Sequence, residues 1–165
     1  MLTAFLIRRR MKRYLLITLF VVTMFFASTQ VASACSCLVP PPGETLKTQV
    51  SKSKDSATAI FVGTVVSVRY SDEQLNGIPL KRFAKFKVER SWKGTSLAFI
   101  EVESANVCCL CGVAFSEGQR YIVYSNSPDA GSLSASSCSR TSAIDKKSDD
   151  EKYLGKQRKI KRSSK

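Results

Sequence analysis

The sequence predicts a small antiparallel β-barrel with flanking helices, stabilised by disulfide bonds and preceded by an export signal. Three observations support this fold class. Five short stretches of strand-forming residues are joined by turn-rich connections. The chain has six cysteines and no histidine, and it opens with a basic and then apolar segment that ends in small residues. Together they indicate one exported domain of ordinary size.

The first 34 residues have the three parts of a secretory signal peptide. Five basic residues precede the apolar run Leu15 to Ala27, and Ala32 and Ala34 supply the small residues before a cut. This run is short for a membrane-spanning helix, which needs roughly 20 residues. We therefore expect residues 1–34 to be removed, with translation starting at Met1 or Met11. The product is secreted, periplasmic or held in the cell envelope; lipid attachment at Cys35 is a less favoured alternative.

The segment after the first two cysteines is predicted to be extended and then helical. Residues 40–42 are three consecutive prolines, which fix φ and remove backbone donors. From Glu44 to Ala57 the chain is polar, with Leu46 and Val50 four residues apart and Glu44 in the first turn. This pattern favours a short helix with a narrow apolar stripe.

The strands follow in order. The strongest is Ala59 to Tyr70, in which Gly63 indicates a bulge. Asn76-Gly77 marks a turn within residues 71–79, and from Lys81 to Trp92 apolar residues alternate with charged ones. The remaining strands are expected at residues 97–103, 119–125 and 132–138, with a turn at residues 129–131. Five strands favour a Greek-key barrel of the OB type over an immunoglobulin-like sandwich, which has about seven.

Most of the positive charge lies at the two ends of the chain. Residues 146–165 hold nine basic and three acidic side chains out of a net charge of +13. We therefore expect a domain over residues 35–145 and a basic tail over 146–165, helical at most around Tyr153 and Leu154 and otherwise disordered. The tail would meet an anionic surface such as lipid headgroups or cell-wall polymer, or would simply be solvated. Nucleic acid is disfavoured, because the strands lack a dense basic and aromatic face.

The cysteines are expected to form disulfides rather than a metal site, because the protein is exported and their spacings lack paired Cys-x2-Cys motifs. Cys108 and Cys111 have redox-motif spacing, but no strand-helix-strand pattern surrounds them. Six cysteines allow 15 connectivities, and the sequence alone does not choose among them. Without a histidine or a serine that has an evident base partner, the chain is not expected to be an enzyme or to need a cofactor or metal of its own.

The ordered cysteines and their neighbours resemble those of a known family. The matching features are Cys35-Ser36-Cys37, Pro40-Pro41, Trp92-Lys93-Gly94, Cys111-Gly112 and Cys138-Ser139. This pattern resembles the tissue inhibitors of metalloproteinases, and more closely their bacterial netrin-like relatives, over Cys35 to about Ile144. The resemblance implies an OB-fold barrel with disulfides Cys35–Cys111 and Cys37–Cys138. Cys108 and Cys109 are left without assigned partners.

The resemblance also implies a function. After signal cleavage, the amine and carbonyl oxygen of Cys35 would chelate the catalytic zinc of a metalloendopeptidase. Ser36 would enter the pocket beside the scissile site, and Leu38, Val39, Pro40 and Leu110 would contact the cleft. The expected product is a monomeric inhibitor. The alternative is a non-inhibitory extracytoplasmic binding or scaffold module with the same fold, since a fold does not by itself fix a function.

Overall fold

A computed structural model of the chain describes Ile17 and residues 35–107, 110–127 and 131–161. The predicted signal peptide apart from Ile17, the two cysteines Cys108 and Cys109, and residues 129–130 of the predicted turn lie outside this part. No helix within it is long and apolar enough to cross a membrane.

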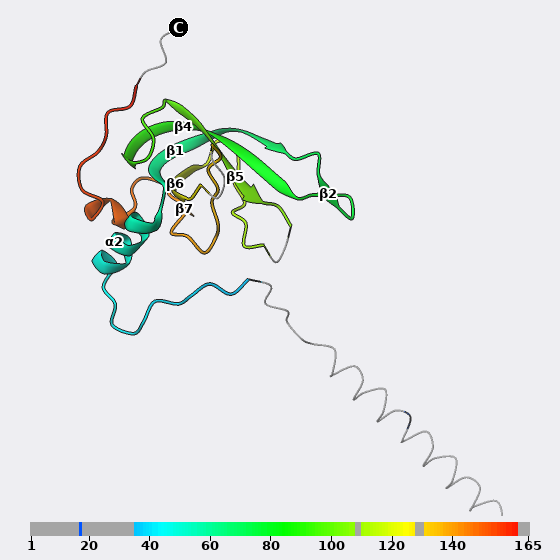
Figure 1. The fold of residues 1–165 in the computed structure, drawn as a ribbon, viewed down its shortest axis with the longest axis horizontal. Helices are drawn as coiled ribbons and strands as arrows, with labels where there is room; N and C mark the ends of the chain where they lie inside the picture. The colour runs from blue at the N-terminus through cyan, green and yellow to red at the C-terminus, as the bar shows by residue number, and fades with distance from the viewer. Residues whose placement is uncertain (1–16, 18–34, 108–109, 128–130, 162–165) are drawn as a thin grey trace, which may run out of the picture. The chain divides into compact units, whose positions relative to one another are not determined.

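Five strands form one antiparallel sheet in the order β5-β4-β1-β6-β7 (Figure 1). They are β1 (Ala59–Tyr70), β4 (Lys81–Lys93), β5 (Phe99–Ala105), β6 (Arg120–Ser125) and β7 (Ser142–Ala143). A small hairpin of β2 (Gln74–Leu75) and β3 (Ile78–Pro79) connects β1 to β4. Its turn is the predicted Asn76-Gly77 pair, whose φ angles of 52° and 78° suit a two-residue hairpin.

The two long strands confirm the apolar patterns in the sequence. In β4 the alternating Ala84, Phe86 and Val88 are buried, while the lysines between them are exposed. In β1 the register against β4 shifts between Val62 and Gly63, which is the predicted bulge. A Cβ at Gly63 would lie 2.7 Å from the backbone oxygen of Lys87, so the two strands approach closely at that point.

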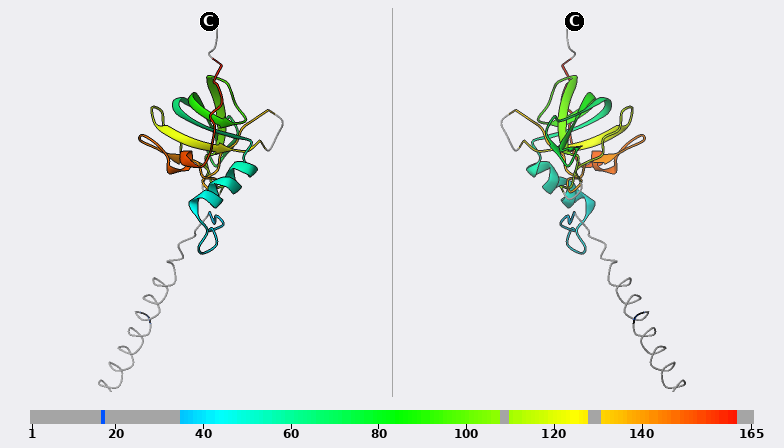
Figure 2. Two further views of the ribbon diagram at one scale, coloured as in Figure 1. Left: turned by 90° about the vertical axis from the view of Figure 1, so that its left-hand side faces the viewer. Right: turned by 90° about the vertical axis from the view of Figure 1, so that its right-hand side faces the viewer.

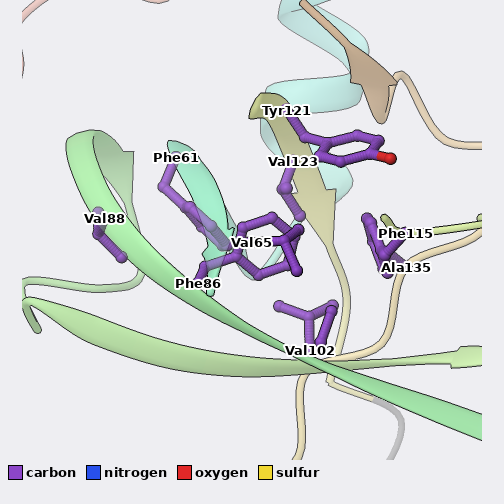
Figure 3. Close-up of a cluster of buried hydrophobic side chains, with 10 residues drawn as sticks. Phe61, Val65, Phe86, Val88, Val102, Phe115, Tyr121, Val123 and Ala135 are labelled. Carbon is purple, nitrogen blue, oxygen red and sulfur yellow. The ribbon is translucent and has the colours of Figure 1, made fainter. Parts of the chain in front are cut away.

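The main core lies on one face of the sheet. Phe86 is at its centre, and its ring makes edge-on contacts with Phe61, Phe115 and Tyr121 at centroid distances of 5.4, 5.1 and 6.2 Å (Figure 3). Edge-to-face packing at these distances is favourable beyond the area it buries. The cluster is completed by Val65, Ala84, Val88, Val102, Val123 and Ala135.

The other face of β1 and β6 is also buried, which explains the continuous apolar runs of these strands. A second cluster there includes Ile60, Val62 and Ile122. The helix α2 (Leu46–Ser56) covers it with Val50 and Leu46. The predicted helix is thus present, but it begins after an N-cap at Thr45, so Glu44 precedes the first turn rather than lying in it. Figure 2 shows α2 beside the end of the twisted sheet that is nearer the described N-terminus.

The predicted fifth strand at residues 132–138 is wrong. This segment contributes only isolated bridges, and the fifth strand of the sheet is β7. The reason lies in its serines. The Ser136 hydroxyl accepts from the amide of Cys138 at 3.1 Å, and the Ser136 carbonyl accepts from the amide of Ser139 at 3.0 Å. Local bonds of this kind compete with a strand ladder and turn the chain.

The predicted disordered tail is also wrong for the part that the structure describes. Residues 149–152 form a 3-10 helix, η1 (Asp149–Lys152), and Leu154 is fully buried in the second cluster. Lys54 Nζ of α2 donates to the Leu154 carbonyl oxygen at 2.8 Å. Beyond it, Arg158 pairs with Ser91 as an isolated bridge. The folded domain therefore continues past residue 145, to residue 161 at least.

The named strands form an open sheet with β5 and β7 at its edges. Between β5 and the end of β6, however, Ser134 makes two isolated bridges. It pairs in parallel with Glu103 of β5 and antiparallel with Asn126, next to β6. Four backbone hydrogen bonds of 2.7 to 2.9 Å accompany these bridges. The segment around Ser134 thus links two strands that are not neighbours in the sheet.

Candidate functional site

Two disulfides join the start of the domain to two distant segments. Cys35 is bonded to Cys111 and Cys37 to Cys138, with Cα–Cα distances of 5.4 and 5.1 Å. These pairs are the same as those that the family resemblance implies. The sulfur atoms of Cys35, Cys111 and Cys138 all lie within 4.8 Å of one another, so the two bridges are adjacent. Disulfides indicate an extracellular or otherwise oxidising compartment.

Backbone contacts to two neighbouring segments hold Cys111 in place. Its carbonyl oxygen accepts from the amide of Ser137 at 2.7 Å and from the hydroxyl of the same residue at 3.1 Å. Cys111 has a φ of 51°, in the left-handed region that few non-glycine residues adopt. Gly112 follows it and packs directly on the backbone of Ala105, the last residue of β5. The end of β5 therefore fixes the position of the first bridge.

Replacing Gly112 by alanine tests this anchoring. The added Cβ would overlap the carbonyl oxygen of Ala105, which is backbone and cannot rotate away. We expect the free energy of unfolding to fall by about 2 kcal/mol or more, as for an overpacked site. Chemical denaturation measures this change.

Gly118→Ala is the matched control, because a Cβ there meets nothing within 4 Å and only its φ of 75° is unfavourable. It should cost about 1 kcal/mol. Equal losses for the two variants would contradict the close approach of Gly112 to β5.

The residues after Cys35 are presented to solvent. Ser36 is exposed, and the side chains of Leu38 and Val39 are 101% and 82% exposed. Leu110, which precedes the bridged Cys111, is 59% exposed. Exposed aliphatic side chains grouped on a rigid segment mark contact surfaces more often than isolated ones do. The disulfide brings Leu110 to the same end of the domain as residues 35–40.

A turn ends this exposed segment. Pro40 is exposed, and the amide of Glu44 donates to the carbonyl oxygen of Pro41 at 3.1 Å. Such a turn, with Pro42 and Gly43 at its centre, leads directly into the N-cap of α2. The segment from Cys35 to Thr45 is therefore tied at one end by two disulfides and at the other by a helix.

A groove of about 800 Å³ lies beneath the segment. One wall is formed by residues 38–41, and the others by α2, residues 138–142 and residues 148–150. Its charges are paired within the domain: Lys52 with Glu44 at 2.5 Å, and Arg140 with Asp150 at 2.6 Å. Because these charges are paired, the groove is not a strongly charged pocket.

The pair of Arg140 and Asp150 belongs to a buried polar cluster. Arg140 donates two hydrogen bonds to Asp150, at 2.6 and 2.7 Å, and the hydroxyl of Tyr124 donates to the same carboxylate at 2.8 Å. Burial, and then the hydrogen bond to Asp150, raise the pKa of Tyr124 well above its usual value. The hydrogen bond to Asp150 raises the pKa of Arg140. The cluster joins β6 to η1 close to the second bridge.

The structure brings most of the predicted site residues together, and it adds a group that the sequence analysis missed. Cys35, Ser36, Leu38, Val39, Pro40 and Leu110 all adjoin the two bridges, whereas Cys108 and Cys109 lie outside the described residues. The cluster of Tyr124, Arg140 and Asp150 was missed. Its members are 10 to 26 positions apart, so no local pattern connects them.

No protein-family model matches this chain, and no curated protein matches it.

Proposed function

We propose that this protein is a secreted inhibitor of zinc metalloendopeptidases that acts through the N-terminal amine and carbonyl oxygen of Cys35. The observation that carries the proposal is the bond between Cys35 and Cys111 at the exposed end of the domain. Because the thiol of Cys35 is in this disulfide, the backbone amine and carbonyl oxygen of Cys35 would be the groups that bind the zinc. In this proposal the protein is not itself an enzyme and holds no cofactor.

The chemistry follows from the open coordination position of a catalytic zinc, which water normally fills. An α-amine and the carbonyl oxygen of the same residue form a five-membered chelate that displaces this water. The amine becomes available only when residues 1–34 are removed, so the proposal includes the predicted signal peptide. Cleavage before Cys35 would then activate the inhibitor.

The exposed side chains would supply the rest of the interface. Ser36 would enter the pocket next to the zinc, while Leu38, Val39 and Pro40 would lie along the substrate cleft. Leu110 would form a second contact beside them. Because the disulfides and the prolines already fix this segment, less conformational entropy is lost on docking, and this favours affinity.

The proposal includes an OB-type barrel as the scaffold. The bridges at Ser134 support it, because they connect β5 in parallel to a segment that pairs antiparallel next to β6. With β1 already paired to both β4 and β6, this connection would complete a circuit of five strands. Barrel closure of this kind removes exposed strand edges.

An alanine added before Cys35 tests the mechanism. The extended and the correctly processed proteins are assayed against a panel of zinc metalloendopeptidases. We expect the processed protein to inhibit at least one enzyme and the extended protein to inhibit none, because the extra residue replaces the amine by an amide. The thermal stability of the two proteins should be equal, since the addition lies outside the fold.

Inhibition that survives the added alanine would exclude the chelate. A protein that inhibits no member of the panel would favour the binding-module alternative, in which the same exposed segment contacts a partner without reaching zinc.

A further inference from the structure

The basic end of the chain is held against the sheet. The amide of Arg158 donates to the carbonyl oxygen of Ser91 at 2.7 Å, and the amide of Lys161 donates to that of Ser96 at 2.6 Å. We call residues 156–161 the C-terminal strap. The backbone that carries its cations is therefore held beside β4. Within the domain, the strap and the start of the described N-terminal segment lie at opposite ends (Figures 1 and 2).

Cations of β4 join those of the strap. Lys85 and Lys87 are exposed, because the residues that alternate with them are buried in the main core. Lys87 and Arg158 line the same concavity, of about 430 Å³. Lys85 Nζ lies 5.7 Å from the centre of the Phe99 ring, on the neighbouring strand. Together with Lys159 and Lys161, these residues form a surface that we call the cationic face.

The cations of this face outnumber its carboxylates. Within the described part of the chain, none of its five cations has an acidic partner. Two carboxylates lie among them: Glu89, in the same concavity, pairs with Arg120 at 2.8 Å, and Glu101, opposite Lys85 in the sheet, pairs with Arg69 at 2.6 Å. The face therefore attracts an anionic partner.

Apolar side chains lie among the cations. Leu97, which forms a bridge with Lys161, is 56% exposed, and Phe99, which pairs with Lys87 across the sheet, is 45% exposed. Cations around exposed aliphatic and aromatic groups are typical of surfaces that rest on anionic membranes, where the apolar groups enter the headgroup boundary. A soluble polyanion would bind the cations but would leave the side chain of Leu97 exposed to water.

We propose that the cationic face docks the protein on an anionic lipid bilayer, with Leu97 and Phe99 entering the headgroup boundary. This inference does not depend on zinc chelation, because none of the residues of the face belongs to the exposed segment that begins at Cys35.

Sedimentation with vesicles tests the proposal. The protein beginning at Cys35 is used, because every described hydrogen bond and both disulfides fall after that position. It is mixed with vesicles of phosphatidylcholine alone, or of an equimolar mixture of phosphatidylcholine and phosphatidylglycerol. We expect binding to the mixed vesicles only. The Lys159→Glu/Lys161→Glu variant should bind at least about thirtyfold more weakly, from about fivefold for each lysine near an anionic surface.

Two further variants separate the contributions. Phe99→Ser should weaken binding about tenfold, because an apolar side chain no longer leaves water. The control Lys47→Glu/Lys147→Glu makes the same charge change outside the cationic face, in α2 and just before η1. It should bind nearly as tightly as the original protein. All four substituted lysines are exposed, so the variants should fold.

Three results would overturn the proposal. If the control variant loses as much binding as the strap variant, net charge alone accounts for the attraction. If Phe99→Ser has no effect, the face is a general polyanion surface, as for nucleic acid or cell-wall polymer. If soluble glycerophosphate displaces the protein at constant ionic strength, the site binds a small anion rather than a bilayer.

Discussion

Replacing either disulfide by two serines is expected to lower the free energy of unfolding by about 3.5 kcal/mol, and replacing both by about 8 kcal/mol. The bridges span sequence separations of 76 and 101 residues, and a loop of that size alone corresponds to about 4.5 kcal/mol. The two loops overlap, however. While one bridge is closed, the other closes a circuit of only about 29 residues, through the two positions from Cys35 to Cys37 and the 27 from Cys111 to Cys138.

Removing one bridge therefore lowers the free energy of unfolding by less than half of what removing both does, because the two bridges are adjacent. Because small domains are stable by about 5 to 15 kcal/mol, the variant without both bridges should be unfolded or close to it. Guanidinium unfolding of the three variants measures these differences, and the original protein treated with a dithiol reductant should behave as the variant without both bridges. A variant without both bridges that is no less stable than the single-bridge variants would contradict the loop-entropy account.

The elements whose side chains follow a simple period were predictable from the sequence. Residues 81–92 alternate because one face of β4 packs on the core and the other meets water, and burial in the structure follows this alternation over residues 84–89. β1 gave a continuous apolar run because its first half is buried on both faces, by the main core on one side and by the cluster under α2 on the other. In both strands, burial determined the composition directly.

The segment at residues 132–138 was harder to predict, because its apolar residues alternate as in a strand while its serines bond locally. Leu133 and Ala135 pack on the main core. The pairing nevertheless extends no further than single bridges, since the hydroxyl and carbonyl of Ser136 bind the following amides. Local hydrogen bonds of this kind leave no periodic signal in the sequence.

The C-terminal strap shows how composition can mislead. Its high content of lysine and arginine is typical of a solvated tail, yet it is anchored by residues that precede it. A capping box between Ser148 and Glu151 starts η1, and the buried Glu151 pairs with Arg90 at 2.5 Å. The Ser-x-x-Glu spacing is a readable signal for a helical start. The ion pair and the burial of Leu154 are long-range contacts that only the fold reveals.

The candidate site likewise has one part that was predictable from the sequence and one part that was not. Apart from Leu110, the exposed residues at its surface are contiguous in sequence, so a motif from Cys35 to Pro40 could identify them. The contacts that hold the first bridge come from the end of β5 and from the turn at Ser137. These supports are distant in sequence and consist of common residue types. The exposed segment was therefore predictable from the sequence, whereas the contacts that hold it were not.

Replacing Phe86 by alanine is expected to lower the free energy of unfolding by about 4 kcal/mol. Phe86 is fully buried on β4, and its ring contacts three other aromatic rings that belong to β1, β6 and the segment between β5 and β6. Removing it takes away the transfer energy of the ring and leaves a cavity that these three segments cannot all close at once. The loss should be measured by chemical denaturation with both disulfides oxidised.

Phe99→Ala is the matched control, because Phe99 lies on the adjacent strand with its side chain 45% exposed. The same deletion there should cost less than about 1 kcal/mol. Similar losses for the two phenylalanines would mean that the interior of the sheet does not pack around Phe86. A large loss for Phe86 alone would show that the stability of the scaffold depends on this core, whatever partner the exposed segment after Cys35 contacts.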